Sequence, residues 1–301
     1  IFLFLFNNLY AETVSEDKSI SNSTETNQQN IDTAEVTLTI TNSTVTRGNK
    51  SIVVNSGLAD VSISIDSNST VKTTSGDNPI LGENTTRLSV DNYGTITSSS
   101  KKAIDIYRTT DATITNNSGG EIYAAGNTFR TGGRSDDNSV GYTITNSGKI
   151  YSTNTTNSAI FGNANSTGGK IVNNSGGEIY SSGSQATIKV GASTTITNSG
   201  SIKNNSDLDN SSISLLGNSN TVTLKNDGIV VGVIEAADGT TGNKLQMQHG
   251  FGQGYFYETS GDFTLEDLDG NQVVKGSAGS VGQGGSETLD ELLGYKSLNI
   301  R

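Results

Sequence analysis

Short alternating segments recur along the chain, and each has the same order of residues. An apolar residue, one further residue and Asn are followed by a Gly-containing turn and then by Ile or Val. Such alternation is typical of strands with one buried face, and Asn-Gly corners supply the positive φ of tight turns. The copies are LSVDNYGTIT (88–97), TITNNSGGEIY (113–123), TITNSGKIY (143–151), KIVNNSGGEIY (170–180), TITNSGSIK (195–203) and TLKNDGIVV (223–231).

The apolar residue after each turn fixes the repeat length. Its successive copies lie 23 to 29 residues apart, at Ile96, Ile122, Ile150, Ile179, Ile202 and Val230. A second apolar column lies between them, at Ile80, Ile104, Ile160, Ile188 and Ile213, and is degraded around Phe129, where a polar loop intervenes. A fixed repeat with constant corner residues disfavours an antiparallel sandwich, although the strands of a sandwich also alternate.

This repeat predicts an all-β protein, a right-handed parallel β-helix (solenoid) over residues 36–235. Strands this short form long parallel sheets when each turn of chain stacks on the previous one, about 4.8 Å away. We expect about seven turns, and a C-terminal β-hairpin cap to protect the last one. Stacked Asn side chains can bond from turn to turn. The expected column is Asn92, Asn116, Asn146, Asn173 or Asn174, Asn198 and Asn226.

The segments on either side of the repeat differ from it in composition. The opening IFLFLFNNLYA is an apolar run that ends in a small residue, as does the tail of a secretory signal. Beyond Gly239, aromatic residues and Asp-Gly turns predict strands near 255–259, 263–265 and 273–275. The expected parts are a signal remnant (1–11), a disordered polar segment (12–35), the β-helix (36–235), capping hairpins (236–276) and a linker with a short helix (277–301).

Composition narrows the classes of function. Hydrophobic residues make up only 31% of the 301 residues, which suits a thin linear core better than a compact one. The chain has no Cys and one His, which excludes thiolate chemistry and multi-His metal centres. The net charge of −11 disfavours nucleic acid as a partner. We therefore expect no cofactor and no metal.

The order of these parts resembles the passenger domain of bacterial autotransporters, the type V secretion systems. The resemblance rests on the opening apolar run, the TITNSG repeats, the aromatic segment YFYETSGDFTLEDLDG (255–270) and the linker before LDELLGYKSLNIR (289–301). In that family an outer-membrane β-barrel of the same precursor anchors the passenger. The resemblance implies export through the periplasm and outer membrane of a Gram-negative bacterium, and an extracellular or cell-surface location.

Many β-helices act on polysaccharides, so we searched for clusters of carboxylates and basic residues. Arg130, Arg134, Asp136 and Asp137 share the loop that interrupts the repeat, but a solvated charged loop is the simpler interpretation. His249 would need a nucleophile and an orienting carboxylate, and no G-x-S-x-G elbow is present.

One segment is similar to the start of a calcium loop. Asp267, Asp269 and Asn271 have the spacing of its first ligands, but Ala278 stands where the loop needs Glu. A tight turn at Asp269-Gly270 is therefore the better interpretation of this segment.

Two columns of outward residues are candidates for binding. Tyr123, Tyr151 and Tyr180 each follow an inward Ile, so they are expected to stack on one outside face. Exposed aromatic residues mark interfaces and sugar platforms, whereas a self-stacked ladder would only stiffen the sheet. The other column consists of Thr pairs, which resemble an ice-binding array or simply reflect strand propensity. The pairs are Thr113/Thr115, Thr143/Thr145, Thr195/Thr197 and Thr221/Thr223.

The sequence thus predicts a structural and adhesive passenger without catalytic activity of its own. Its expected partners are a glycan or cell-surface ligand, the β-barrel of the same precursor, and further copies of itself. The alternative is a polysaccharide-acting lyase or hydrolase on the same scaffold, and a more remote one is a surface-binding Thr array.

Overall fold

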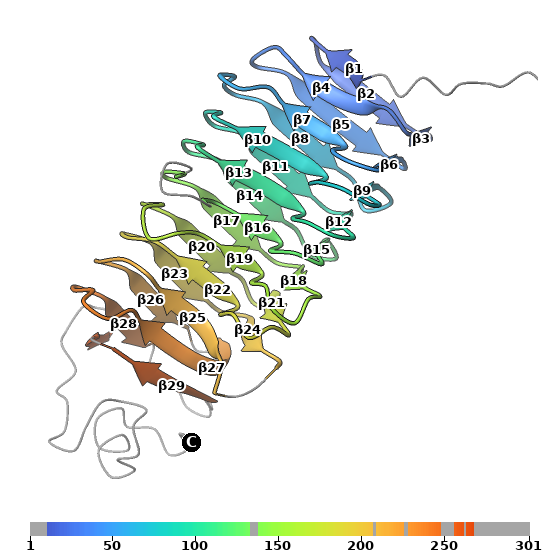
Figure 1. Ribbon diagram of the computed structural model, residues 1–301. Helices are drawn as coiled ribbons and strands as arrows, with labels where there is room; N and C mark the ends of the chain where they lie inside the picture. Colours follow the sequence, from blue (N-terminus) through green and yellow to red (C-terminus); the bar gives the residue numbers. More distant parts are fainter. Residues whose placement is uncertain are drawn as a thin grey trace, which may run out of the picture.

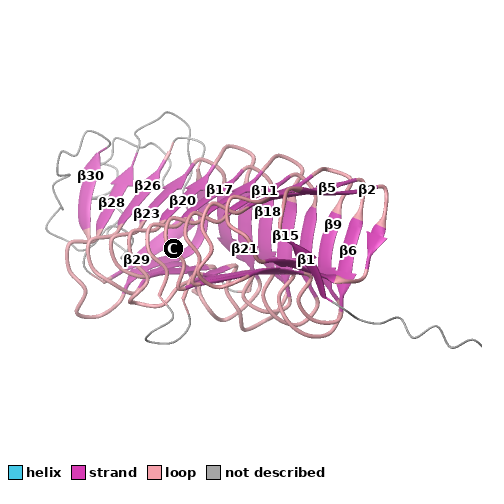
Figure 2. Cartoon of the chain, turned by 90° about the horizontal axis from the view of Figure 1, so that it is seen from above, coloured by secondary structure: helices cyan, strands magenta, loops and turns pink. Residues whose placement is uncertain are grey.

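The chain is a parallel β-solenoid. The computed structural model describes residues 11–132, 138–206, 209–225, 228–247, 256–261 and 263–267. Within these ranges there are thirty strands and no helix, and thus no helix that could span a membrane. Successive turns lie side by side along one axis from β1 to β30 (Figures 1 and 2). The predicted fold class is confirmed, and the right-handed sense of the coil stays a prediction.

Each turn contributes one strand to an 11-stranded sheet, which we call face 1. All its strands pair in parallel with the strand one turn away. They are β2 (Lys18–Ser21), β5 (Thr37–Thr41), β8 (Ser62–Ile65), β11 (Ser89–Asn92), β14 (Thr113–Asn116), β17 (Thr143–Asn146), β20 (Lys170–Asn173), β23 (Thr195–Asn198), β26 (Thr221–Leu224), β28 (Lys244–Met247) and β30 (Thr264–Asp267).

The other 19 strands form two further faces that join at β27 (Ile229–Ala236), which pairs with both β24 and β25. Face 2 contains β3 (Thr24–Glu25), β6 (Thr44–Arg47), β9 (Thr70–Thr73), β12 (Thr95–Ser98), β15 (Glu121–Ala124), β18 (Lys149–Ser152), β21 (Glu178–Ser181) and β24 (Ser201–Asn204). Face 3 contains β1 (Ala11–Val14), β4 (Gln28–Ile31), β7 (Ile52–Val54), β10 (Ile80–Glu83), β13 (Ile104–Tyr107), β16 (Phe129–Arg130), β19 (Ile160–Phe161), β22 (Ile188–Val190), β25 (Ser211–Leu215) and β29 (Phe256–Ser260).

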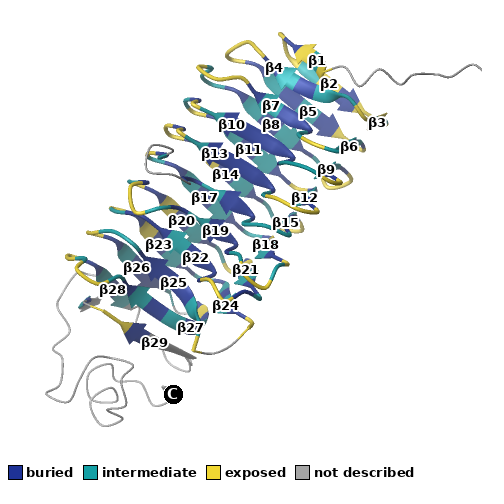
Figure 3. Ribbon diagram, in the orientation of Figure 1, coloured by how far each residue is buried: buried dark blue, intermediate teal, exposed yellow. Residues whose placement is uncertain are grey.

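The core is a set of apolar columns that run along the axis, seen as the dark blue stretches of Figure 3. The column from Ile96 to Val230 lies in register and is fully buried, as predicted. The second column is also confirmed, but it is not degraded: Phe129 lies in register between Ile104 and Ile160 and is fully buried. Because every strand pairing is parallel, the antiparallel sandwich is excluded for the described strands.

A ladder of buried Asn side chains lines one corner of the coil. In each step the Nδ2 of one Asn donates to the Oδ1 of the Asn one turn further on, at 2.8 Å. Asn173, not Asn174, is the member in its turn. The register partner of Asn198 in the next turn is Leu224, and Asn226 lies outside the described residues. The ladder consists of Asn92, Asn116, Asn146, Asn173 and Asn198.

The N-terminal polar segment belongs to the solenoid, so the expectation of disorder over 12–35 is wrong. Its strands β1 and β2 pair with β4 and β5. The apolar side chains buried by β1, β2 and β4 are those of Val14, Ile20 and Ile31. One inward residue per strand is enough in this fold, so a polar composition does not prevent it. Of the predicted signal remnant (1–11), residues 1–10 lie outside the described residues, and Ala11 begins β1.

The described C-terminal strands continue the coil. β28 and β30 extend face 1 and β29 extends face 3, all in parallel pairing. The expectation of capping hairpins over 236–276 is therefore wrong for these described strands, which stack as further turns instead. The predicted strands at 255–259 and 263–265 correspond to β29 and β30. The strand near 273–275, the linker and the short helix fall on residues outside the described ranges.

Candidate functional site

The three tyrosines of face 2 form a stacked ladder. Tyr123, Tyr151 and Tyr180 are register partners on β15, β18 and β21, and each points outward beside a buried Ile. Their ring centroids lie 4.8 and 4.7 Å apart, with interplanar angles of 8° and 4°. This spacing equals the distance between strands. The ring planes therefore lie across the axis, with their faces toward the neighbouring turns.

Small or flexible side chains adjoin both ends of this ladder. Thr97 of β12 is the register partner of Tyr123, and Lys203 of β24 is the partner of Tyr180. Lys72 of β9 lies one further turn beyond Thr97. Thr97 carries no ring, so the face of Tyr123 that points toward β12 is stacked on no aromatic residue of the part of the chain that the structure describes.

A second outward column on the same strands carries alternating charges. Glu121, Lys149 and Glu178 are register partners, and the Nζ of Lys149 lies 4.0 Å from the Oε1 of Glu121. Opposite charges on neighbouring strands stabilise a sheet modestly. Burial, and then the charge of Glu121, raise the pKa of Tyr151 above its ordinary value, so the Tyr151 phenol stays protonated at physiological pH.

A groove of about 400 Å³ opens beside the uncovered end of the ladder. Its lining comes from four consecutive turns of face 2 and is mostly hydroxyl-bearing. The side chains of Lys72, Thr97 and Ser99 have no hydrogen-bond or ion-pair partner among the residues that the structure describes. The lining residues are Lys72, Thr73, Thr74, Thr97, Ser98, Ser99, Tyr123, Ala125 and Thr153. Sequence reasoning found only Tyr123 among them, although the repeat period could have aligned the others.

Arg130, a member of the charged cluster expected in the loop, forms an ion pair with a residue of the neighbouring turn. On face 3 the Nε and Nη2 of Arg130 contact the two carboxylate oxygens of Asp105 at 2.7 and 2.8 Å. Asn78 also donates to this carboxylate, at 2.9 Å. Burial raises the pKa of Asp105, an effect that Arg130 and Lys102 oppose. One partner of Arg130 thus lies one turn away, on β13.

The guanidinium of Arg130 also lies over the ring of Tyr107, 4.7 Å from its centroid. The Asp105 side chain is only 2% exposed, and both its oxygens are engaged. The arrangement therefore ties neighbouring turns together. The other predicted members of this cluster, Arg134, Asp136 and Asp137, lie outside the described residues.

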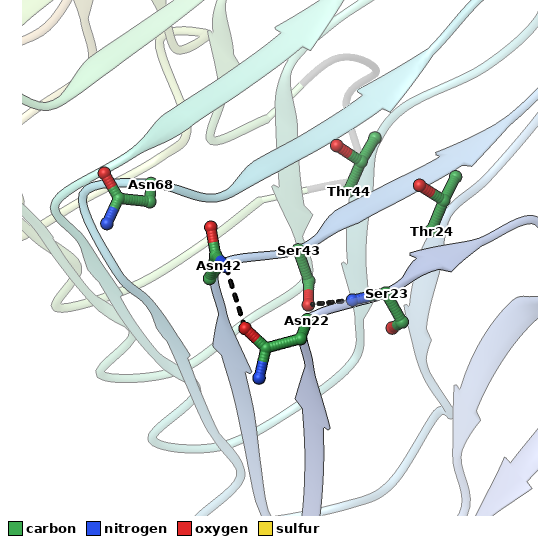
Figure 4. A pocket seen from close by; sticks show the side chains of 7 residues that line it. All are labelled: Asn22, Ser23, Thr24, Asn42, Ser43, Thr44 and Asn68. Carbon is green, nitrogen blue, oxygen red and sulfur yellow. Dashed lines mark hydrogen bonds between the residues drawn. The ribbon is translucent and has the colours of Figure 1, made fainter.

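A second groove, of about 360 Å³, lies at the corner between faces 1 and 2 near the N-terminal end (Figure 4). The Nδ2 of Asn42 donates to the Oδ1 of Asn22 at 2.8 Å, and the Oγ of Ser43 accepts from the Ser23 amide at 3.1 Å. All lining residues are Asn, Ser or Thr, which suit hydrogen bonding rather than acid–base chemistry. They are Asn22, Ser23, Thr24, Asn42, Ser43, Thr44 and Asn68.

The remaining predicted sites do not form one surface. Lys170 and Val172 lie between the Thr pairs of β17 and β23, so the Thr array of face 1 is interrupted and carries no surface-binding proposal. His249, Asp269 and Asn271 lie outside the described residues, and Asp267 ends β30. No group of three His, Asp or Glu side chains within the described ranges is placed to hold a metal ion.

Comparisons with protein-family models, with curated proteins and with solved structures returned no match for this chain. What the chain shows of its function therefore comes from its own geometry.

Proposed function

We propose that this chain is an adhesive β-solenoid displayed outside the cell, of the kind that autotransporters export as passengers, and that it has no catalytic activity of its own. A coil of parallel strands presents long faces, and residues one repeat apart form continuous columns on them. Face 2 uses such a column to place three aromatic rings on the outside. The supporting sequence feature is the order of apolar run, repeats and aromatic segment.

The observation that carries the proposal is the outward ladder of Tyr123, Tyr151 and Tyr180. The tyrosine rings are not needed to fill the core, because the inward Ile column already does so. Partly exposed aromatic residues in a row are characteristic of surfaces that bind sugars or other partners. The flanking Glu–Lys–Glu column adds polar contacts beside the rings.

Adhesion can be tested with a column exchange. Binding to host-type cells is measured for beads coated with the parent protein and for beads coated with a variant. In the variant the three ladder tyrosines are changed to Thr, the residue at position 97 of the same column. We expect loss of binding. The control changes Thr115, Thr145 and Thr197 of face 1 to Val, the residue at position 172 of their own column. Equal binding by both variants and the parent protein would overturn adhesion through this ladder.

The location outside the cell has its own test. Intact source cells are treated with trypsin, and released peptides are identified by mass spectrometry. We expect peptides from the 36–235 region without lysis, since its Lys and Arg side chains include exposed ones such as Arg87. Peptides that appear only after lysis would contradict surface display.

A polysaccharide-acting enzyme is the second candidate, and one observation favours it. Glu83, Asp105, Arg108 and Arg130 gather on neighbouring turns of face 3, and Arg108 pairs with Glu83 at 3.6 Å. Carboxylates and Arg on one face are what such enzymes require. The test is release of reducing ends from neutral and acidic polysaccharides. Activity that Asp105→Asn abolishes would support the enzyme, and no release from any of them would end this candidate.

A further inference from the structure

We propose that the groove at the N-terminal end of the tyrosine ladder binds a single carboxylate-bearing pyranose, a uronic acid, at the end of a glycan. The sugar ring would stack on Tyr123 and its carboxylate would pair with Lys72. This inference rests on the adhesive function proposed above and names the ligand class of one part of the same face.

The first argument is the uncovered ring of Tyr123. One face of this ring is stacked on Tyr151 at 4.8 Å, and the other points toward Thr97. In this column the chain builds a ring on three consecutive turns and then stops. A flat ring of similar size can therefore occupy the position above Thr97 that a fourth tyrosine would take. The apolar face of a pyranose is such a ring, and aromatic faces favour this contact.

The second argument is the length of the slot. Tyr123 and Lys72 are two strands apart, which corresponds to about 9.5 Å along the axis. Thr97 forms the floor between them. One sugar ring fills the position next to Tyr123, and a substituent on that ring then lies within reach of the flexible Lys72 side chain. A longer run of sugars would have to leave the slot.

The third argument is the chemistry of the lining. Lys72 is the only charged residue among the lining residues, and it has no ion-pair partner among the described residues. The hydroxyls of Thr97 and Ser99 also have no partner there, so both can bond to sugar hydroxyls. An unpaired ammonium beside free hydroxyls matches a carboxylated sugar better than a neutral one.

The net charge of the chain limits the ligand further. At −11 the protein repels an extended polyanion. A single acidic sugar near Lys72 is affected less, because charges more than about 8 Å away are screened at physiological ionic strength. We therefore assign the groove to one terminal uronic acid rather than to a polyuronate chain.

The experiment uses the full chain and two probes, a disaccharide that ends in glucuronic acid and its counterpart that ends in glucose. We expect the glucuronide to bind more tightly. Lys72→Gln should weaken it about 2- to 5-fold, the range of an exposed ion pair, and leave the glucoside unchanged. Tyr123→Ala should weaken both about tenfold. No measurable binding of the glucuronide, or equal effects of Lys72→Gln on both probes, would overturn the proposal.

A matched pair of ladder extensions separates the site from general effects on folding. Thr97→Tyr should add a fourth stacked ring, fill the slot and abolish binding. Lys203→Tyr should extend the ladder at its other end and leave binding intact. Melting curves are the check that both variants fold. Equal binding by the two variants overturns the assignment. If Thr97→Tyr retains adhesion to cells but neither variant binds the glucuronide, the groove assignment fails while the adhesive function stands.

Discussion

At the scale of single residues, the core depends on matched sizes in neighbouring turns. Tyr142 is fully buried at the start of face 1, where it is the largest side chain in its column. One turn later Gly169 makes room for it. A Cβ atom on Gly169 would lie 2.3 Å from the Cζ of Tyr142, closer than any real contact. The absence of a side chain at position 169 is therefore a packing requirement.

We expect Gly169→Ala to destabilise the protein by about 1–3 kcal/mol, because overpacking forces its neighbours to shift. In a Tyr142→Ala background the same change should cost much less, since the ring is gone. Chemical denaturation of the parent protein, the two single variants and the double variant gives the coupling energy between positions 142 and 169. Equal costs in both backgrounds would contradict the predicted contact.

Asp66 shows how a corner is fixed by a single carboxylate. It accepts from the amides of Asn42 and Asn68 and from the hydroxyl of Ser69. Partial burial opposes ionisation, but these hydrogen bonds together outweigh it and lower the pKa of Asp66. The corner is therefore held by hydrogen bonds to an ionised side chain.

At the scale of elements, the Asn ladder is a buried hydrogen-bonded column that sets the register. Asn146, in its middle, donates to Asn173 and accepts from Asn116. Asn92, at its end, donates to Asn116, while its own Oδ1 has no partner among the described residues. Ile65 precedes Asn92 in the column and Leu224 follows Asn198, so apolar residues of similar size fit these positions.

Changing Asn146 to Leu should therefore cost about 2–4 kcal/mol, since it leaves the Oδ1 of Asn173 and the backbone N–H of Gly148 without the partners that Asn146 supplies. Changing Asn92 to Leu should cost about 1–2 kcal/mol, because it leaves only the Oδ1 of Asn116 without its donor. Thermal and denaturant unfolding measure both. If Asn92→Leu lowers the free energy of unfolding as much as Asn146→Leu does, the Asn ladder does not act through the hydrogen bonds described.

The tyrosine ladder makes a prediction about alkaline pH. Burial raises the pKa of Tyr151 and Tyr180 above the value of about 10 found in unfolded chains. The stability linked to this shift is fully present below pH 10 and is lost as the pH rises toward the folded pKa. Phenolate absorbance should show these groups titrating late. Tyr151→Phe should remove part of that late step, and an unchanged titration curve would contradict the stacked, half-buried ring.

At the scale of the whole molecule, the parallel coil distributes stability over nearest-neighbour contacts between turns. Ile150 is fully buried between Ile122 and Ile179. Ile150→Asp should cost more than about 4 kcal/mol, because it buries an unpaired charge.

Hydrogen exchange shows where that cost falls. Protection should be lost first in β15, β18 and β21, while β5 and β8 retain theirs. Lys149→Ser, on the outward side of the same strand, should change stability by less than about 0.5 kcal/mol. Uniform loss of protection along the chain would contradict a nearest-neighbour solenoid.

Much of this architecture follows from the repeat alone. The inward Ile columns and the Asn ladder recur at regular positions, so their register could be read from the sequence. The strands of residues 12–35 could not, because a strand that buries one residue has almost no compositional signature. The Asp105–Arg130 pair and the groove at Tyr123 were also missed. Both bring together outward-pointing residues that are some 25 positions apart in the sequence, and the residue types at these positions do not repeat from turn to turn.

The register of neighbouring turns is the central claim, since the core, the Asn and tyrosine ladders and the groove at Tyr123 all depend on it. The chain has no Cys, so engineered pairs can test it without interference. Lys149 and Glu178 are outward partners on adjacent strands, and Ser201 lies one turn further on. Changing Lys149 and Glu178 to Cys should give rapid disulfide formation under mild oxidation, because their Cα atoms lie within bridging distance. The pair at 149 and 201 should not cross-link within one chain. Cross-linking of the second pair, or failure of the first, would contradict the parallel solenoid described here.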